Sequence, residues 1–552
     1  MNTINKLDGQ LFEKLIIGGA INLKANVKEV NELNVFPIPD GDTGDNMYMT
    51  INGGIEYLKK ENDLSLSKKA IALANGMMLS ARGNSGVILS QLFNGLAKGL
   101  EGVDSADVLQ MCNAFKQAVK QAYSAVVKPV EGTILTVARE AVEYTEAEKA
   151  YTQSINDFFE KYLFKMKNSL ERTPDLLETL KEAGVIDSGG AGLVYIIEGI
   201  KEVLEGKEIT DEKSFESTKQ TIDFSKFNEN SIMEYGYCTE FLLQLQTSKI
   251  NINNFDIQVI IDYLNTIGDS IVAYLTGTVV KIHVHTLQPY KALEFCQKFG
   301  EFLTIKIENM TLQHNEVINN NQAEGKKTKR PKKKYGIVAV ANGEGLINTL
   351  IESGVDEVIN GGQTNNPSTK SFIEAFEKVN AEYIYVFPNN SNIIMTANEA
   401  KQLYKDAMVY VINTKDFGQA YSALSVVDFG VEDPEEIRQV LEEAKDNVIT
   451  GLITKSIRDA NINSVDIHEG DYIGFCDKTM HTSKANKLDA YFDLIKKMNA
   501  EDKSFLINVY GKDVLESEKE LIESKLKEKY SNLEVYSING EQEVYDFMVV
   551  LE

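Results

Sequence analysis

An acidic loop near the start of the chain carries the residue types best suited to binding a metal ion. Asp40, Asp42 and Asp45 stand within six residues, with two glycines and Thr43 between them. Asp and Gly favour turns, and glycine lets the backbone approach a ligand closely. Carboxylates at this density repel one another unless a cation lies between them, and hard oxygen ligands favour Mg²⁺ or Ca²⁺. We interpret the loop as a metal site, against the alternative of an ordinary solvated acidic turn.

The spacing within this loop favours Mg²⁺ over Ca²⁺. An EF-hand calcium loop requires glycine at its sixth position and glutamate at its twelfth. Counted from Asp40, those positions hold Asp45 and Ile51. Mg²⁺ takes one or two protein carboxylates and completes its shell with water and substrate phosphates. Asp40 and Asp42, two residues apart in an extended turn, fit that arrangement, so the loop predicts a magnesium–nucleotide site.

A second glycine-rich segment, Ala81–Gly86, directly precedes the helical pattern Val87–Leu96. Unpaired backbone N–H groups at a helix N-terminus attract phosphate. The alternative is a plain helix start capped by Asn84 or Ser85. The chain contains no GxxxxGK[ST] motif, so any nucleotide site differs from a P-loop. Together with the acidic loop, this segment favours phosphate binding.

A pair of histidines predicts a zinc site further along the chain. His283 and His285 stand two apart on a strand pattern, so both point to one face of the strand. Cys238 begins another strand pattern nearby in the sequence, and Glu240 or His314 is a candidate fourth ligand. Two histidines and a cysteine are a suitable Zn²⁺ set, and the zinc could be structural. The alternative is a pair of ordinary surface or core histidines.

Two polar loops in the last third of the chain are weaker candidates. Asn342–Gly345 resembles half of a dinucleotide-binding fingerprint. Gly361–Ser368 follows the strand pattern Glu357–Asn360, and clefts at the carboxyl ends of such strands often bind ligands. A turn followed by a helix capped at Ser368 explains the second loop equally well.

Residues 1–207 predict an all-α domain that positions the first two segments. Lys69–Leu79, Ser105–Val127 and Asp175–Gly184 carry apolar residues at helical spacing, and the glycines fall between such segments. A helical domain with its glycines in the loops is typical of a bundle with its chemistry at one end.

Residues 208–320 predict a small α+β domain and residues 321–334 a basic linker. The domain has strand patterns at Cys238–Gln246 and Thr278–Thr286, with a helical pattern at Asn254–Thr266. The linker carries the seven Lys or Arg residues found between Lys326 and Lys334. On so acidic a chain we interpret this run as a solvated tether rather than a nucleic-acid site.

Residues 335–552 alternate strand and helix patterns, which predicts an α/β domain of one or two lobes. Helical patterns at Thr369–Val379 and Ala397–Lys405 separate the first strands. The expected parallel strands are Gly336–Ala341, Ala381–Phe387 and Met408–Asn413, and later strands are Asp471–Cys476, Ser504–Tyr510 and Leu533–Ile538.

The composition excludes several classes of partner. The formal charge is 57 − 82 = −25 over 552 residues, which disfavours nucleic acid and anionic membrane surfaces. No apolar segment is long enough to span a membrane. The four cysteines lie far apart, and the N-terminal segment lacks signal-peptide features. We therefore expect a cytoplasmic protein.

Four segments carry a resemblance to a known family. Asn34–Met47, Ser80–Gln91, Val130–Thr133 and Gly184–Gly190 resemble the nucleotide-binding helical domain of dihydroxyacetone kinases. The order of a helical, a small and an α/β domain is similar to the bacterial fatty acid kinase FakA family over the whole chain. The resemblance implies a barrel of helices that holds ATP at its mouth with Mg²⁺ ions on an Asp cluster.

The resemblance also implies roles for single residues. Asp45 departs from the family pattern, since that position is often uncharged, so we do not assign it to the metal. The resemblance implies that Asp40 and Asp42 bind magnesium and act in catalysis, and that Asn34 stands where the sugar kinases have a third Asp. It implies phosphate contacts for Thr43, Gly44, Asn46, Ser85 and Gly86. It implies nucleotide contacts for Thr133, Asp187 and Gly189.

The expected function is an ATP-dependent kinase that phosphorylates the carboxylate of a fatty acid to give an acyl phosphate. By the resemblance, a separate fatty-acid-binding protein presents the acyl chain and docks on the last domain, and the middle domain makes a homodimer. One alternative is a dihydroxyacetone-type kinase in which His283 or His285 holds the sugar. The other is a non-catalytic ATP sensor.

Overall fold

The chain forms two compact units, one joining Met1–Glu216 with Lys332–Glu552 and the other comprising Ser217–Pro331. The fold is multidomain, with a helical N-terminal part, a small α+β middle part and an α/β C-terminal part, which confirms the predicted fold class. The computed structural model describes residues 3–34, 41–126, 128–207, 237–252, 255–276, 278–286, 288–309, 332–362, 365–427, 429–477, 479–530 and 532–552.

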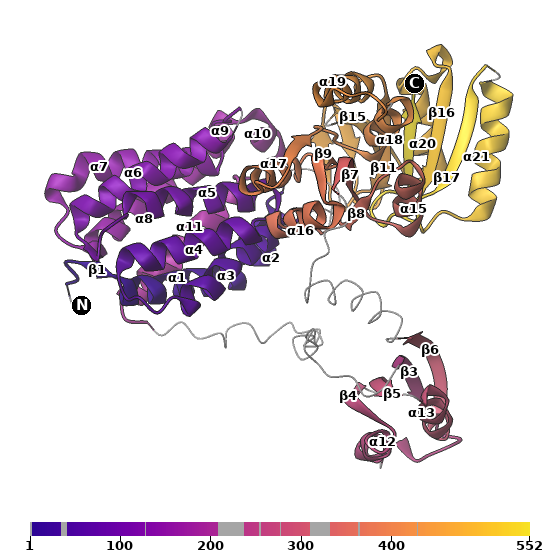
Figure 1. Cartoon of the computed structure of the whole chain (residues 1–552), viewed down its shortest axis with the longest axis horizontal. Coiled ribbons are helices and arrows are strands. Elements are labelled where there is room, and N and C mark those ends of the chain that lie inside the picture. Colours follow the sequence, from indigo (N-terminus) through magenta and orange to yellow (C-terminus); the bar gives the residue numbers. More distant parts are fainter. Residues whose placement is uncertain are drawn as a thin grey trace. The chain divides into compact units, whose positions relative to one another are not determined.

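The helical part packs around one apolar core (Figure 1). The predicted segment Asp175–Gly184 is divided, because Leu177 is extended between two short helices, and Gly184 ends the second in a left-handed conformation. The helices are α1 (Gly9–Ala25), α2 (Val27–Glu32), α3 (Thr43–Lys60), α4 (Leu66–Ser80), α5 (Gly83–Gly99), α6 (Val108–Ala125), α7 (Ile134–Glu148), α8 (Ile155–Glu171), α9 (Thr173–Leu176), α10 (Glu178–Ala183) and α11 (Ser188–Leu204).

The helix predicted from Ser105 begins later, at Val108, because Asp107 caps it. The Asp107 carboxylate accepts from the Gln110 N–H while the Gln110 side chain accepts from the Asp107 N–H, which is a capping box. The preceding residues form the short strand β2 (Ser105–Ala106), which pairs with β1 (Leu7–Asp8).

The middle part is a four-stranded antiparallel sheet in the order β4-β5-β3-β6. Its core is small and includes Phe241, Ile260 and Val284. The sequence patterns miss two of its strands, β4 and β6. Its elements are β3 (Tyr237–Leu245), α12 (Gln258–Leu264), β4 (Gly268–Thr276), β5 (Val279–Thr286), α13 (Pro289–Cys296) and β6 (Gly300–Asn309).

The first lobe of the α/β part is a parallel sheet in the order β10-β9-β7-β8, with helices on both faces. Alternate residues of β7 face opposite layers: Val338 packs with α16 and α17, and Ile337 with α15, α18 and α19. Its elements are β7 (Lys333–Ala341), α15 (Glu344–Glu352), β8 (Glu357–Asn360), α16 (Thr369–Val379), β9 (Ala381–Phe387), α17 (Ile394–Leu403), β10 (Met408–Val411), α18 (Phe417–Val426) and α19 (Pro434–Ala444).

The second lobe is a six-stranded mixed sheet in the order β15-β14-β11-β18-β16-β17, which confirms two lobes. Only β16 and β17 pair in parallel among these neighbours. A hairpin, β12 (Ala460–Ile462) with β13 (Val465–Ile467), lies beside it. The remaining elements are β11 (Ile449–Lys455), β14 (Tyr472–Cys476), β15 (Thr479–Lys484), α20 (Lys487–Lys497), β16 (Phe505–Tyr510), α21 (Glu516–Lys529), β17 (Glu534–Asn539) and β18 (Phe547–Leu551).

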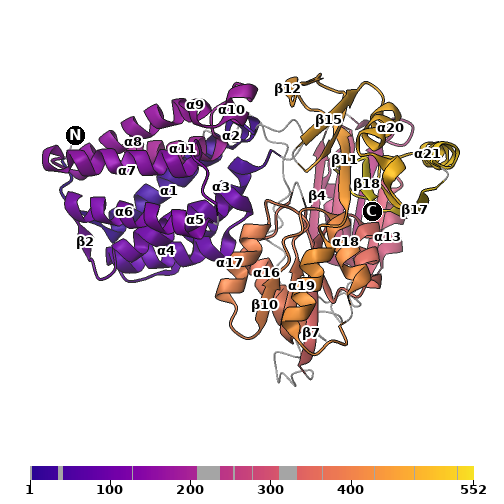
Figure 2. The same ribbon diagram turned by 90° about the horizontal axis from the view of Figure 1, so that it is seen from above.

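The helical and α/β parts share a seam formed by α16 and α17 against the α4–α5 corner (Figure 2). The Thr369 N–H donates to the Ala81 carbonyl at 3.2 Å. Glu399 on α17 is buried in the seam, 6% exposed, where its Oε1 accepts from Gln91 Nε2 at 2.9 Å and Ser90 Oγ at 3.4 Å. Burial raises the pKa of Glu399 from 4.5 to about 7.

Glu399→Gln should therefore change how stability depends on pH. A carboxyl whose pKa is raised on folding binds its proton more tightly in the folded state. The stability that this proton binding contributes is full below pH 4.5 and is lost as pH rises through about 7. The glutamine amide cannot ionise. The free energy of unfolding of the variant should therefore exceed that of wild type by up to roughly 3 kcal/mol at pH 8 and equal it at pH 4. Thermal unfolding of both full-length chains at the two pH values measures this. Equal pH slopes for the two chains would contradict it.

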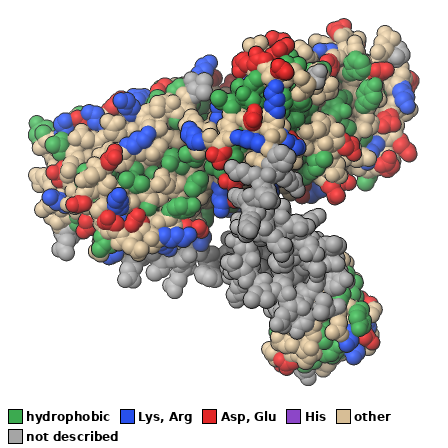
Figure 3. All heavy atoms as spheres, in the orientation of Figure 1, with side chains coloured by type: hydrophobic (Ala, Val, Ile, Leu, Met, Phe, Trp, Pro, Cys, Tyr) green, Lys and Arg blue, Asp and Glu red, His purple; other side chains and the backbone are tan. Residues whose placement is uncertain are grey.

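Charged side chains of both signs are interspersed over the visible face of the helical and α/β parts (Figure 3). None of the helices in the described ranges is both long and apolar enough to cross a membrane.

Candidate nucleotide and metal site

A cavity of about 400 Å³ lies where the helical part faces the α/β part within the first unit. Its walls come from the start of α3, the start of α5, α10, loops of both α/β lobes, and the strands β11, β12 and β14. The helical part contributes Asn34, Asp42, Thr43, Asn46, Asn84, Ser85, Thr179, Glu182 and Ala183, and the α/β part contributes Asn390, Ser391, Asn392, Lys415, Asp416, Thr450, Leu452, Ile462, Asn463, Phe475, Asp477 and Tyr545.

Asp42 is the described aspartate of the acidic loop that lines this cavity; Asp40 lies outside the described residues. Asp42 directly precedes the first turn of α3, and its side chain does not cap that helix. Asn366 Nδ2, from the α/β part, donates to Asp42 Oδ2 at 2.6 Å. Burial raises the pKa of Asp42 to about 7, and the neighbouring charge of Asp45 adds to the rise against a hydrogen bond from Asn46. A bound cation would favour the ionised carboxylate.

Asn34 and Thr43 form one hydrogen-bonded group at the cavity wall. Thr43 Oγ1 donates to Asn34 Oδ1 at 2.9 Å, and Ser188 Oγ lies 3.3 Å from Asn34 Oδ1 and 3.4 Å from Thr43 Oγ1. Ser188 begins α11, so this group ties the start of α3 to the start of α11. Ser188 has no role in the sequence predictions, although it lies in the motif Gly184–Gly190.

Asp45 and Gly44 contact α2 rather than the cavity. Asn31 Nδ2 donates to Asp45 Oδ2 at 2.7 Å, and the Gly44 N–H donates to Asn31 Oδ1 at 2.7 Å. A side chain at Gly44 would lie 2.6 Å from the Val27 carbonyl oxygen, so close helix packing requires this glycine. This arrangement gives Asp45 a structural role and favours packing as the role of Gly44.

The start of α5 is open to the cavity. The helix begins at Gly83 with Arg82 as its N-cap residue, and no described side chain caps it, so capping by Asn84 or Ser85 is wrong. Gly83 has φ +57, and a β-carbon there would lie 2.8 Å from Asn46 Nδ2 and 3.2 Å from Asn366 Nδ2. Ser85 therefore lies in a first turn whose N–H groups lack a partner among the described side chains, a geometry that suits an anion.

Gly86 lies at the contact of α5 with α3, where a β-carbon would overlap Thr50 Oγ1. We predict that Gly86→Ala costs about 1–3 kcal/mol of stability through overpacking. Thr50→Ala removes the obstructing hydroxyl, so the double variant should regain much of the loss. Thermal unfolding and ATP binding of the four chains separate packing from phosphate contact. A double variant that is stable but still cannot bind ATP would favour direct phosphate contact, and one that binds ATP would favour packing.

Thr133, Asp187 and Gly189 group together, although none of them lines the cavity. Asp187 Oδ2 caps α11 by accepting from the Gly190 N–H at 2.7 Å, and burial raises the pKa of Asp187 to about 6. A β-carbon at Gly189 would lie 3.3 Å from Ile134, the residue after Thr133. These three residues adjoin the cavity through Ser188, and their nucleotide contacts stay a prediction.

The described lining of the cavity is acidic. It contains one basic side chain, Lys415, and four acidic ones, Asp42, Glu182, Asp416 and Asp477. Lys415 Nζ pairs with Asp477 Oδ2 at 3.0 Å. A triphosphate is strongly anionic and would be repelled here unless divalent cations accompanied it.

The residues present fit Mg²⁺. Asn84 Oδ1 and Asn366 Oδ1 are buried and have no hydrogen-bond partner among the described residues. A buried oxygen of this kind calls for a donor, and Mg²⁺ usually keeps several bound waters that could donate. The Asp42 carboxylate and these amide oxygens are the hard donors that Mg²⁺ prefers.

The predicted zinc ligands meet in the backbone register of the middle sheet. Cys238 pairs with His285, and Glu240 pairs with His283, across antiparallel β3 and β5. The four residues therefore occupy adjacent positions on one sheet face. Their side chains and His314 lie outside what the structure describes, and no group of three metal-binding side chains occurs among the described residues.

The two polar loops of the α/β part have structural explanations. Ser368 caps α16 by accepting from the Ser371 N–H at 3.2 Å, as the helix-cap interpretation predicts. Side chains at Gly343 and Gly345 would overlap the backbone near Asn539 and Gly540, so these glycines permit close packing rather than the approach of a dinucleotide.

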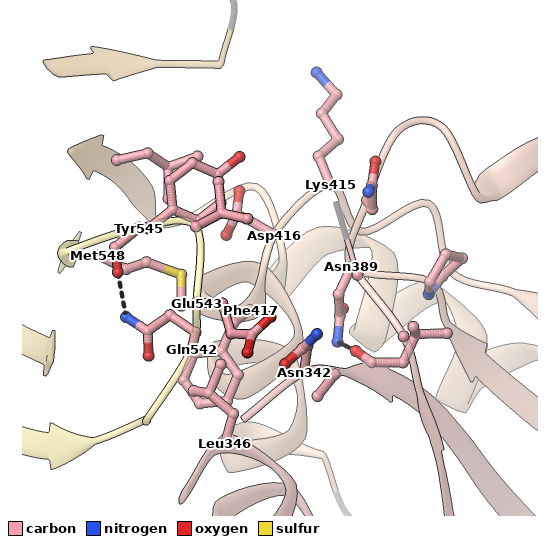
Figure 4. A pocket seen from close by; sticks show the side chains of 18 residues that line it. Asn342, Leu346, Asn389, Lys415, Asp416, Phe417, Gln542, Glu543, Tyr545 and Met548 are labelled. Atoms are coloured by element: carbon pink, nitrogen blue, oxygen red, sulfur yellow. Dashed lines mark hydrogen bonds between the residues drawn. The ribbon is translucent and has the colours of Figure 1, made fainter. Parts of the chain in front are cut away.

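A smaller hollow of about 90 Å³ lies between the two lobes, and Gly361 and Gly362 belong to its lining. Figure 4 shows this hollow from close by. Leu346 and Phe417 form its apolar end, and Lys415 extends away from them. Asn390, Lys415, Asp416, Leu452 and Tyr545 line both this hollow and the larger cavity.

Family comparisons first define the class of protein. The model of the DAK2 domain matches residues 37–202, which contain the described cavity wall of α3 and α5. The chain is therefore of the kind that joins a DAK2 domain, the helical domain of dihydroxyacetone kinases, to further domains.

The remaining matches give the family. Models of the FakA-like C-terminal domain and the FakA-like middle domain of fatty acid kinases match residues 336–552 and 234–317. The chain belongs to the FakA-like fatty acid kinase family, which confirms the resemblance. It is 37% identical over 559 residues to the protein YloV of Bacillus subtilis (strain 168) and 34% identical over 555 residues to an uncharacterised protein of Staphylococcus aureus (strain USA300), with 100% of each chain covered.

Two solved structures resemble parts of the chain. DegV, a fatty acid binding protein from Bacillus subtilis, is 13% identical with a TM-score of 0.31, over 40% of this chain and 99% of that chain. The dihydroxyacetone kinase from C. freundii, in complex with AMP-PNP and Mg²⁺, is 18% identical with a TM-score of 0.29, over 36% of this chain and 35% of that chain.

Proposed function

We propose that the chain is the ATP-dependent kinase component of a two-protein fatty acid kinase. One observation carries the proposal: in a chain of this family, Asp42 and the uncapped start of α5 face the same cavity. Phosphoryl transfer needs positioning and charge neutralisation more than a covalent catalyst, and this set of groups offers both.

The chain's own groups orient the nucleotide. Ser85 and the N–H groups at the start of α5 hold phosphate oxygens, with Thr43 and Asn46 at the start of α3 on the other side. Asp42, together with Asp40, holds Mg²⁺, which neutralises charge on the phosphates. Thr133, Asp187 and Gly189 extend the nucleotide contacts beyond Ser188.

The acceptor is the carboxylate of a fatty acid. A carboxylate oxygen forms the new bond to the γ-phosphorus, the bond from that phosphorus to the β–γ bridging oxygen breaks, and ADP leaves with the electron pair. An ionised carboxylate has no proton to remove, so no general base is needed.

A separate protein holds the acyl chain and docks on residues 335–552. A ligand of that length needs an enclosed apolar pocket of about 300 Å³ or more. The apolar hollow of the α/β part has about 90 Å³, which is too small.

In the middle domain, Cys238, His283 and His285 bind a structural Zn²⁺, and that domain joins two chains into a homodimer.

ATP consumption in a panel of acceptors tests the proposal. We expect turnover with Mg²⁺ when fatty acid and a fatty-acid-binding partner are both present, and no turnover when either is left out. Turnover with dihydroxyacetone alone would instead place the substrate site on this chain. ATP binding without turnover under any condition would favour the sensor.

A further inference from the structure

The α/β part contributes directly to the metal–nucleotide site, beyond the docking role proposed for it. We propose that Asn366 is a positioning residue for Asp42, which makes the α/β domain a functional part of the phosphoryl-transfer site in the same chain. This inference rests on the proposed function, because it takes Asp42 as a metal ligand.

The first observation is the contact itself. Asn366 Nδ2 donates to Asp42 Oδ2 at 2.6 Å, across 324 positions of sequence. A hydrogen bond to a charged acceptor is stronger than a neutral one, and it fixes the rotation of the carboxylate. The contact uses one lone pair of Asp42 Oδ2 and leaves Oδ1 outside this bond, so the carboxylate can still accept a cation.

The second observation is that Asn366 is itself held in place from the helical side. Arg82 Nη1 donates to the Asn366 carbonyl at 2.9 Å, and Gly83 lacks the side chain that would crowd the Asn366 amide. Asn366 is 2% exposed. Its position therefore depends on the turn that begins α5, where the phosphates are proposed to bind.

The third observation is that Asn366 Oδ1 is buried and has no hydrogen-bond partner among the described residues. A purely structural asparagine would satisfy both ends of its amide, because an unmet buried acceptor is costly. An oxygen next to a metal-binding carboxylate can accept from water bound to the cation. The Asn366 amide would then orient the Asp42 carboxylate through Nδ2 and a water on the cation through Oδ1.

Removing a residue that hydrogen-bonds to a metal ligand usually lowers metal affinity or activity by about 10- to 100-fold. We expect Asn366→Ala to raise the half-saturating Mg²⁺ concentration for ATP turnover within that range. Asn366→Leu keeps the size but loses both the donor and the acceptor of the amide, so its Mg²⁺ dependence should be weakened at least as much as that of Asn366→Ala. A role in packing alone would give the reverse order.

The control variant weakens the contact between the helical and α/β parts at a position away from Asp42. Gln91→Ala removes the Gln91–Glu399 hydrogen bond and lies outside the cavity lining. Full-length wild type and the three variants are compared by Mg²⁺-dependent ATP turnover, by calorimetric titration with ATP and Mg²⁺, and by thermal unfolding. We expect Gln91→Ala to shift unfolding but to keep the Mg²⁺ dependence of wild type.

The outcomes separate this inference from the proposed function. Equal or tighter Mg²⁺ dependence in either Asn366 variant would overturn the inference, and so would a shift of the same size in Gln91→Ala. Wild type that binds ATP with Mg²⁺ but phosphorylates no fatty acid would overturn the proposed acceptor only, since the titration still reports on Asn366. Wild type that binds no ATP would overturn both.

Discussion

Replacing Asp42 with alanine should lower ATP turnover by about a thousandfold or more and leave the chain folded. Holding a cation at the transferred phosphoryl group is worth several kcal/mol in the transition state, and each 1.4 kcal/mol is about tenfold in rate. The fold should survive, because the Asp42 side chain caps no helix and its burial already disfavours its charge. Turnover under saturating ATP, with thermal unfolding of the same samples, measures both expectations.

Asp45→Asn is the matched control for this prediction. It removes a carboxylate charge three residues further on, where Asn31 holds the side chain away from the cavity. We expect this variant to keep turnover within a fewfold of wild type. Equal losses in the two variants would mean that general charge, and not a metal ligand, sets the rate. Unchanged turnover in Asp42→Ala would remove Asp42 from the site.

The middle domain should contain one tightly held Zn²⁺ per chain, and His283→Ala or His285→Ala should abolish it. The register that pairs Cys238 with His285 and Glu240 with His283 gathers suitable ligands on one sheet face. The domain has a small core, so metal binding should contribute much of its folding energy. Elemental analysis of the purified full-length chain measures the zinc, and thermal unfolding measures the stability of this unit.

His468→Ala is the control for zinc, because His468 is exposed and lies in the other compact unit. It should keep the full zinc content. Loss of zinc from His283→Ala should also lower the unfolding temperature of the middle unit while leaving that of the first unit unchanged. Purified protein without zinc, or zinc retained in both histidine variants, would contradict the prediction.

The sequence predicts the elements best where one physical signal dominates. The strand Ala381–Phe387 of the α/β part is apolar apart from Glu382 and occurs with the bounds expected, whereas β7 begins earlier than expected, at Lys333, and β10 ends earlier, at Val411. The strands β4 and β6 of the middle domain are missed although each carries a strand signal: Ile271–Leu275 in β4 is an apolar run, and Leu303–Glu308 in β6 alternates apolar and polar residues. The late start of α6 follows from a capping box at Asp107, which the helical pattern alone does not reveal.

The candidate site is predictable only in part. Asp42, Thr43, Asn46 and Ser85 line one cavity, as local motifs of Asp, Gly and Ser suggest. Asn366 could not be assigned to Asp42 from sequence, because that contact arises only when two domains pack.

Gly44 shows the opposite limit of sequence reasoning. A glycine in a phosphate-binding motif can equally serve helix packing, and close contact with Val27 supports packing here. Sequence patterns identify which residue types are unusual, but they do not state which neighbour makes each residue necessary.

The most direct test of the proposed function is to trap the acyl phosphate itself. The full-length chain, ATP, Mg²⁺ and a fatty acid bound to its carrier protein are incubated with hydroxylamine, which converts an acyl phosphate into a fatty hydroxamate. We predict that hydroxamate and ADP form in equal amounts, and that neither forms without the carrier or with Asp42→Ala. ADP formed without hydroxamate would contradict the proposed transfer to a fatty acid carboxylate.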